Sequence, residues 1–199
     1  DMLDARVAPG PLTAGPDDLC VMPYTSGTTG KPKGCMHTPR SVMCTALGVV
    51  NWASGTQNSI LLSVLPLFHV TGMQQVMNAI INVGATLVIL PRWDAVAAAT
   101  MVERYKCSHW VNVPVMVVDM LNNQTAMTHD ISSLRFIMGG GSAMPEAVAA
   151  KLKELCDVEY VEGYGLSESA SGGILNPINR PKRQCLGIPW FNTLARIVD

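Results

Sequence analysis

Residues 24–34 read YTSGTTGKPKG and combine hydroxyl side chains, three glycines and two lysines in one short span. Glycines allow a backbone to approach a ligand closely with its N–H groups turned inward, and Ser and Thr hydroxyls add further donors. Lys31 and Lys33 add positive charge. A polyphosphate site needs these features, because it requires many short donors, charge compensation and no bulky side chains. The segment therefore predicts a phosphate-binding loop, and a flexible polar surface loop is the alternative.

Two other chemistries fit these residues less well. The phosphate loop of kinases and GTPases requires G-x-x-x-x-G-K-[ST]. When Gly30 and Lys31 are aligned with its G-K, Thr25 occupies the position of the first glycine and Pro32 that of the final Ser or Thr. A serine-hydrolase elbow requires G-x-S-x-G, which segment 165–169 breaks at its last position and segment 24–28 breaks at both glycines. Neither a kinase-type nucleotide site nor an esterase is favoured.

The elements that must position these residues follow from an alternation of short apolar runs with longer helical patterns. Strands are expected at 19–24, 59–66, 86–91, 109–114, 134–140 and 158–165. Helices are expected at 41–52, 71–82, 94–105, 115–122 and 145–155, with Thr38 and Asp94 as N-caps. This alternation predicts an α/β fold in which helices flank a mainly parallel sheet.

Three glycine-rich segments follow predicted strands: 24–34, MGGGSAMP at 138–145 and EGYGLSES at 162–169. Ligands of open parallel sheets bind at the carboxyl ends of strands. If the three loops lie side by side, they form one polar floor for one ligand.

Composition narrows the function classes. The net charge is −1, so no overall basic field exists for nucleic acid, and 48% hydrophobic content indicates a globular chain. The six cysteines form no C-x-x-C pair, which favours a reducing compartment, and we expect a cytoplasmic protein without a secretory signal or transmembrane segment. Residues 1–18 are expected to be a linker or the edge of a preceding region, and 19–199 one domain.

With these loops in this order, the chain resembles the adenylate-forming (AMP-binding) superfamily and, within it, the acyl-CoA synthetases. The resemblance rests on YTSGTTGKPKG, LPLFHVTG (65–72), MGGGSAMP, EGYGLSE and LGIP (186–189), and it covers nearly all of 19–199. It implies the central part of a layered N-terminal domain. It also implies ATP-dependent activation of a carboxylic acid, with a fatty acid as the nearest class, and transfer of the acyl group to coenzyme A.

The resemblance also implies roles for individual residues. The β- and γ-phosphates of ATP would be held by Thr25, Ser26, Gly27, Thr28, Thr29, Gly30 and Lys33. The two faces of adenine would be covered by Gly140, Gly141 and Ser142 on one side and by Gly163, Tyr164 and Gly165 on the other, with the Tyr164 ring stacking on the base. Ser142 departs from the family, which often has Pro at that position.

Four residues would carry the chemistry. Lys33 would compensate phosphate charge, and His69 would lie near the acyl carboxylate and the path of the thiol. Ser167 stands where the family usually has Thr, and its hydroxyl would reach the α-phosphate. Glu168 would bind Mg²⁺, a hard cation suited to one carboxylate and phosphate oxygens.

Other features are interpreted as structural. His37, His109 and His129 are expected to be structural or solvent-facing, and Arg180–Arg183 a solvated loop. Residues 111–117 and Met138 are candidates for lining an acyl pocket, whereas the Met-rich stretches are expected to fill the core.

The resemblance further implies that the ribose-binding Asp, the adenylation Lys and the C-terminal domain lie outside this sequence. We therefore expect a fragment that is inactive alone and self-associates through exposed apolar surface. A non-catalytic nucleotide-binding or scaffold module is the alternative.

Overall fold

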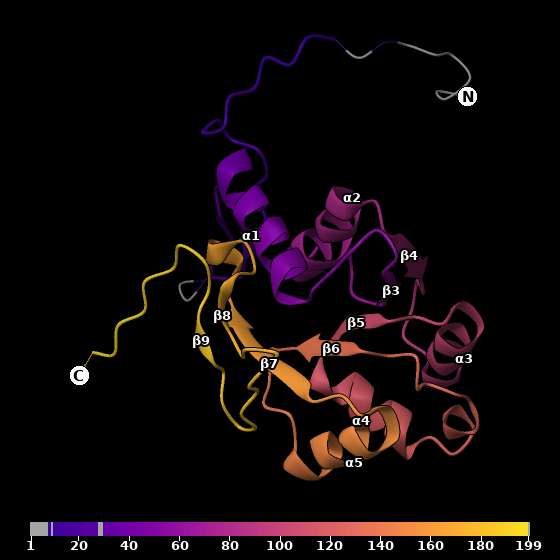
Figure 1. The fold of residues 1–199 in the computed structure, drawn as a ribbon. Helices are drawn as coiled ribbons and strands as arrows, with labels where there is room; N and C mark the ends of the chain where they lie inside the picture. Colours follow the sequence, from indigo (N-terminus) through magenta and orange to yellow (C-terminus); the bar gives the residue numbers. More distant parts are fainter. Residues whose placement is uncertain (1–7, 9, 28–29, 199) are drawn as a thin grey trace.

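The structure is a computed structural model that describes residues 8, 10–27 and 30–198 (Figure 1). It confirms the predicted α/β class. A seven-stranded sheet has the order β4-β3-β5-β6-β7-β8-β9. The five strands β3 to β7 pair in parallel, whereas β8 pairs antiparallel with β7 and β9 antiparallel with β8. Its strands are β3 Ile60–Ser63, β4 Thr86–Ile89, β5 His109–Asn112, β6 Phe136–Gly139, β7 Tyr160–Gly165, β8 Gly173–Leu175 and β9 Ile188–Pro189.

Helices cover both faces of this sheet (Figure 1). One face carries α1 Pro39–Trp52, the π-helix η1 Thr71–Asn78 and α2 Ala79–Val83; the other carries α3 Ala95–Tyr105, α4 Pro114–Asn122 and α5 Glu146–Cys156. Two short 3₁₀ turns, η2 Ala126–Thr128 and η3 Ser167–Ser169, complete the helical elements of the described residues.

Alternate residues of the central strands pack into separate cores. Leu62, Trp110 and Ile137 belong to the cluster beneath α3, α4 and α5. Their sequence neighbours Leu61, Val111 and Met138 belong to the cluster beneath α1 and α2. Since successive side chains of a strand point to opposite faces, short apolar runs suffice to cover a sheet on both sides. Met138 is therefore core, and it is 2% exposed.

Local signals place the helix starts as predicted. Thr38 Oγ1 accepts the Ser41 backbone N–H at 3.3 Å while Ser41 Oγ accepts the Thr38 N–H at 3.1 Å, which caps α1 reciprocally. Asp94 Oδ1 accepts the Ala97 N–H at 2.7 Å and caps α3. The predicted helix 71–82 differs, because its first eight residues are wound as a π-helix.

The prediction of a sheet strand at 19–24 is wrong. Val21 forms only an isolated bridge with His37, and β1 Tyr24–Thr25 pairs antiparallel with β2 Lys33–Gly34 in a separate two-stranded hairpin. The segment finds its partner locally, because the chain returns on itself after the glycine-rich loop, and Pro23 cannot donate to a sheet ladder. Strands β8 and β9 were not predicted.

No helix within residues 8–198, apart from the positions left undescribed, has the length and apolar character needed to cross a bilayer.

Candidate functional site

Two of the three glycine-rich loops lie side by side. β6 and β7 pair in parallel with Gly139 opposite Glu162, so the segments leaving their carboxyl ends start from adjacent positions. A Cβ on Gly140 would lie 2.5 Å from the Gly163 carbonyl oxygen. Only glycine permits this approach, which brings the two predicted adenine-binding segments together. Gly141 has a φ of +84°, and both Gly141 and Ser142 are exposed.

Glu162 fastens these two loops to each other, a role that the sequence reasoning missed. Its side chain is buried, Oε2 accepts the Met144 backbone N–H at 3.1 Å, and Oε1 accepts the Gln184 N–H at 3.2 Å. Gln184 Nε2 donates in turn to the Met144 carbonyl at 2.6 Å. The available signal was a glutamate that directly follows the buried residues Tyr160 and Val161, since a buried carboxylate requires partners.

The buried polar pair Tyr160 and Asn112 lies beneath the loops that follow β6 and β7. The Tyr160 hydroxyl donates to Asn112 Oδ1 at 3.0 Å beneath Gly139, where a Cβ would overlap the phenol oxygen. Burial raises the Tyr160 pKa, and the negative charge of Glu162 raises it further. Tyr160 therefore stays a neutral donor and fixes the ends of β5, β6 and β7.

Tyr164 lies at the outer end of β7 between Gly163 and Gly165. The residue is 49% exposed, so a planar ligand can reach it. Gly165 cannot carry a side chain, because a Cβ would overlap the Ser171 carbonyl oxygen. The chain turns sharply here, which leads directly to Ser167 and Glu168.

Ser167 and Glu168 occupy the turn η3, with Ser167 half-buried and Glu168 exposed. The Ser167 carbonyl accepts a hydrogen bond from His37 Nε2 at 2.7 Å. Since a carbonyl oxygen only accepts, Nε2 must carry a proton. His37 is buried, so it is structural as predicted, and it connects η3 to the chain that follows β2.

His69 is exposed in the connection between β3 and η1. Its Nδ1 accepts the Thr71 backbone N–H at 3.2 Å, which leaves Nε2 as the protonated nitrogen of a neutral ring. Thr71 Oγ1 accepts the Ser171 hydroxyl at 3.1 Å. His69 therefore lies in a segment that is fastened to the turn that follows Glu168.

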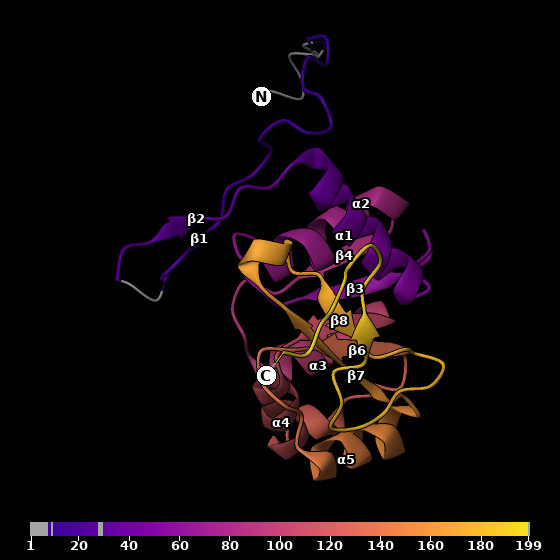
Figure 2. The same cartoon turned by 90° about the vertical axis from the view of Figure 1, so that its left-hand side faces the viewer.

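The predicted phosphate-binding residues are carried by the β1–β2 hairpin, which projects from the body of the molecule (Figure 2). Thr25 on β1 pairs with Lys33 on β2, and Gly27 and Gly30 have positive φ angles of 64° and 84°. Ser26 and Lys33 are exposed, whereas Thr28 and Thr29 lie outside the described residues. The expectation that all three loops follow strands of one sheet is thus wrong for this loop.

Glu168 supplies the one predicted carboxylate ligand for a magnesium ion at this site. The described part of the chain contains no cluster of three or more His, Cys, Asp or Glu side chains suited to a metal. The exposed Glu168 fits Mg²⁺, because this ion usually combines one or two protein carboxylates with phosphate oxygens and waters.

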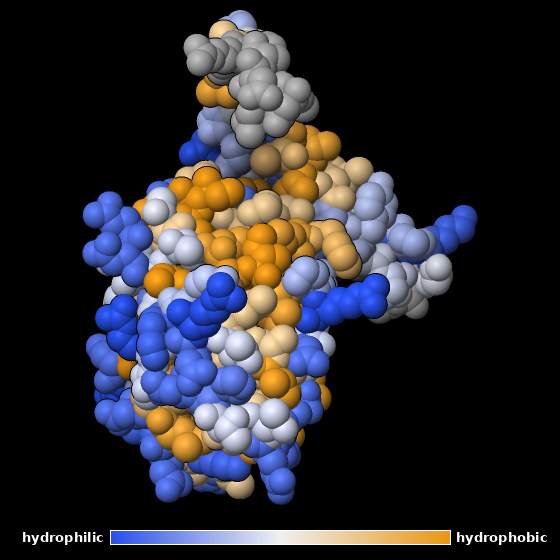
Figure 3. Space-filling model, turned by 90° about the vertical axis from the view of Figure 1, so that its right-hand side faces the viewer, coloured by the Kyte–Doolittle hydropathy of each residue, from blue (hydrophilic) through white to orange (hydrophobic). Residues whose placement is uncertain are grey.

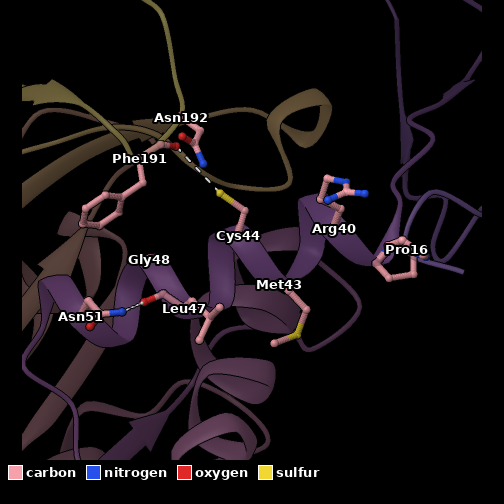
Figure 4. A pocket seen from close by; sticks show the side chains of 10 residues that line it. Pro16, Arg40, Met43, Cys44, Leu47, Gly48, Asn51, Phe191 and Asn192 are labelled. Carbon is pink, nitrogen blue, oxygen red and sulfur yellow. Dashed lines mark hydrogen bonds between the residues drawn. The ribbon is translucent and has the colours of Figure 1, made fainter.

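A hollow of about 680 Å³ lies away from these residues, along the outer side of α1 (Figure 4). Met43, Cys44 and Leu47 of α1 line it together with Phe191. No residue predicted for the nucleotide site contributes to its lining.

Comparisons with known proteins agree with this architecture. The family model described as AMP-binding enzyme matches residues 3–199. A long-chain-fatty-acid–CoA ligase of Bacillus subtilis is 31% identical over 183 residues, which are 90% of this chain and 33% of that relative. A 4-coumarate–CoA ligase 1 of Narcissus pseudonarcissus is 33% identical over 159 residues, 77% of this chain and 29% of that relative.

Among solved structures, the inhibitor-bound N-terminal domain of FACL13 from Mycobacterium tuberculosis superposes with a TM-score of 0.78 at 32% identity, covering 86% of this chain and 42% of that one. The chain spans about a third of the length of the curated relatives named above. The sheet and its helices thus have the arrangement of the N-terminal domain of adenylate-forming enzymes, and the chain belongs to the AMP-binding enzyme family.

Proposed function

We propose that the protein containing this chain joins a carboxylic acid to coenzyme A through an acyl-adenylate. The observation that carries the proposal is the close contact between the loops at the ends of β6 and β7, where Gly140 packs against the Gly163 carbonyl. Directly after Gly163, one short segment contains Tyr164, Ser167 and Glu168. An exposed ring, a hydroxyl and an acidic side chain in this order suit a base, a phosphate and a magnesium ion.

The proposed reaction has two steps. A carboxylate oxygen of the acid attacks the α-phosphorus of ATP, and the bond to pyrophosphate breaks. The thiol of coenzyme A, after losing its proton, attacks the acyl carbon, and AMP leaves with the former carboxylate oxygen. Since a carboxylate is already a nucleophile at neutral pH, the protein mainly has to position the reactants and compensate charge.

The residues divide this work. Tyr164 and the Gly140–Ser142 segment hold adenine, Ser167 donates to the α-phosphate, and Lys33 of the projecting hairpin compensates the terminal phosphates. A magnesium ion on Glu168 would supply charge neutralisation on the phosphate oxygens. His69, as a neutral ring with an N–H at Nε2, is placed to donate a hydrogen bond near the acyl carboxylate.

The acid is proposed to be a fatty acid, which is what the Bacillus subtilis relative acts on by its name. The coumarate ligase is of similar identity, so aryl acids must be compared directly. We place the reaction in the cytoplasm, in keeping with six cysteines that are all free in the structure.

The experiment is acid-dependent exchange of labelled pyrophosphate into ATP by the full-length protein, with fatty acids of several lengths, coumarate and benzoate. Exchange should appear with fatty acids. Glu168→Gln should lower it about 100-fold, the scale on which losing one pre-organised charge contact acts. Glu154→Gln, the same change on the exposed side of α5, should leave it unchanged. A folded protein that binds ATP and shows no exchange with any acid would favour the non-catalytic module instead.

A further inference from the structure

The turn that carries Ser167 and Glu168 continues into two residues with unfavourable backbone angles. Ala170 and Ser171 have φ values of 51° and 74°, so two consecutive residues with side chains are left-handed. Residues other than glycine avoid this region because Cβ crowds the following carbonyl. Both residues are buried, at 1% and 5% exposure. Such a conformation persists only where the surroundings determine it, and it is typical of functional sites.

Hydrogen bonds within the turn close it but leave the Ser171 side chain and carbonyl to be satisfied elsewhere. The Ser171 N–H donates to the Leu166 carbonyl at 3.0 Å, and the Ala170 N–H donates to the Ser167 carbonyl at 3.3 Å. The positions of Ser167 and Glu168 therefore depend on where Ser171 is held.

Gln75, which lies in the π-helix η1, holds Ser171 by two hydrogen bonds. Its Nε2 donates to the Ser171 carbonyl at 2.8 Å and to the Ser171 hydroxyl oxygen at 2.9 Å. A carboxamide nitrogen carries two hydrogens, so both bonds can form together. The Ser171 hydroxyl then donates its own hydrogen to Thr71 Oγ1 at 3.1 Å. The left-handed residue is thus fixed by three hydrogen bonds to η1.

The holding element also carries His69. Thr71 donates its backbone N–H to His69 Nδ1, so the imidazole and the Gln75 amide belong to one rigid segment. Eight residues of π-helix are unusual, and π-helical turns often occur at functional sites. Hydrogen bonds therefore join the segment predicted to face the acid to the turn predicted to face the metal.

We propose that Gln75 is a positioning residue that keeps the Ala170–Ser171 turn left-handed and so presets Ser167 and Glu168 for MgATP. This inference rests on the proposed function of that site. Gln75 acts through Ser171 and touches neither Ser167 nor Glu168 among the described contacts.

The test compares Gln75→Glu and Gln75→Met in the full-length protein. Both keep the length of the side chain. The ionised glutamate carboxylate cannot donate a hydrogen bond, but its protonated form has one O–H donor. The methionine side chain has no donor at any pH. At pH 8 both variants should raise the apparent KM for MgATP in pyrophosphate exchange about 10-fold, as expected for a net loss of about 1.4 kcal/mol when the two hydrogen bonds to Ser171 are removed. Half-burial and the facing Ser171 carbonyl oxygen should hold the pKa of the introduced carboxyl above its ordinary value. As the pH falls toward 5.5, Gln75→Glu should therefore recover part of the lost affinity, and Gln75→Met should not.

Gln57→Glu, the same change at an exposed position before β3, is the control and should behave as the unsubstituted protein at every pH. The proposal is overturned if both Gln75 variants leave the KM for MgATP within twofold, if only the KM for the acid changes, or if Gln75→Glu shows no recovery at low pH.

Amide hydrogen exchange across 166–173 provides a readout that needs no nucleotide. Gln75→Met should speed exchange of the Ser171 and Gly172 amides, while rates in β6 stay constant. Unchanged rates would contradict the positioning role even if the protein proved not to adenylate any acid. Should Gln75→Met fail to fold, the pH series of Gln75→Glu decides the question by itself.

Discussion

At the scale of residues, the site depends on side chains that hold backbone rather than on those that face a ligand. Glu162 holds the Met144 amide, His37 holds the Ser167 carbonyl and Gln75 holds Ser171. Tyr164, which is predicted to stack on adenine, and Glu168, which is predicted to bind Mg²⁺, are exposed. The backbone that carries them is therefore held by buried or half-buried partners, as pre-organised binding requires.

Replacing His37 tests this dependence. His37→Leu removes the Nε2–H donor from the carbonyl of half-buried Ser167, which should lower the free energy of unfolding by about 1 kcal/mol. It should also weaken MgATP binding to the full-length protein about 10-fold, because η3 is released on one side. Calorimetric titration and thermal unfolding measure the two effects.

His37→Gln restores a donor of similar reach and should recover most of the binding. His129→Gln is the matched control: His129 contacts Glu103 and Thr100 on the far side of the sheet, so MgATP affinity should not change. Weaker binding in the control, or full binding in His37→Leu, would contradict the assigned role.

At the scale of elements, local sequence placed the helices well and the first strand badly. Thr38 with Ser41, and Asp94 with Ala97, are signals within three residues of their partners, so both helix starts could be predicted. Segment 19–24 has the composition of a strand, but its partner is the chain just after the glycine-rich loop. Composition does not tell which strand a run will pair with.

In the loop after η2, the lowered pKa of Asp130 predicts how stability depends on pH. The Ser132 hydroxyl and amide, and then Lys106 at the end of α3, hold the pKa of Asp130 at about 2, below the ordinary 3.8. A lowered carboxyl pKa means that the unfolded chain binds the proton first. The stabilisation is therefore complete above about pH 4 and is lost as the pH falls toward 2.

Thermal unfolding of Asp130→Asn should accordingly begin at a lower temperature than that of the unsubstituted chain at pH 6. The two melting temperatures should converge between pH 4 and 2. Ser132→Ala, which removes one of the donors, should show part of the same loss. Equal melting temperatures at pH 6 would rule out a stabilising role for this carboxylate.

At the scale of the whole molecule, apolar surface remains on the edge of the sheet. Figure 3 shows hydrophobic surface gathered on the side where α2 and β4 lie. Ile81 of α2 is 71% exposed and Ile89 of the edge strand β4 is 53% exposed. Exposed edge strands with apolar side chains favour association with other chains.

We therefore predict that the 199-residue chain self-associates, with a mass in sedimentation equilibrium that rises with concentration. Ile81→Lys together with Ile89→Lys should shift the equilibrium toward monomer. A constant monomeric mass up to high concentration would show that this surface is not adhesive.

The long-range connections explain what the sequence could not reveal about the site. His37 and Ser167 are separated by 130 positions, and Gln75 and Ser171 by 96. The motif residues were found because their spacing is local. Their supports were not, since a lone His or Gln gives no sign of its partner until the sheet brings distant loops together.

The central claim, that this fold activates an acid through an adenylate, is tested most directly by following the oxygens of the acid. The full-length protein would be incubated with ATP, coenzyme A and a fatty acid labelled with oxygen-18 in its carboxylate, and the products analysed by mass spectrometry. Attack of the carboxylate on the α-phosphorus predicts label in AMP and none in pyrophosphate. Label in orthophosphate with formation of ADP, or thioester formed without label in AMP, would contradict the account.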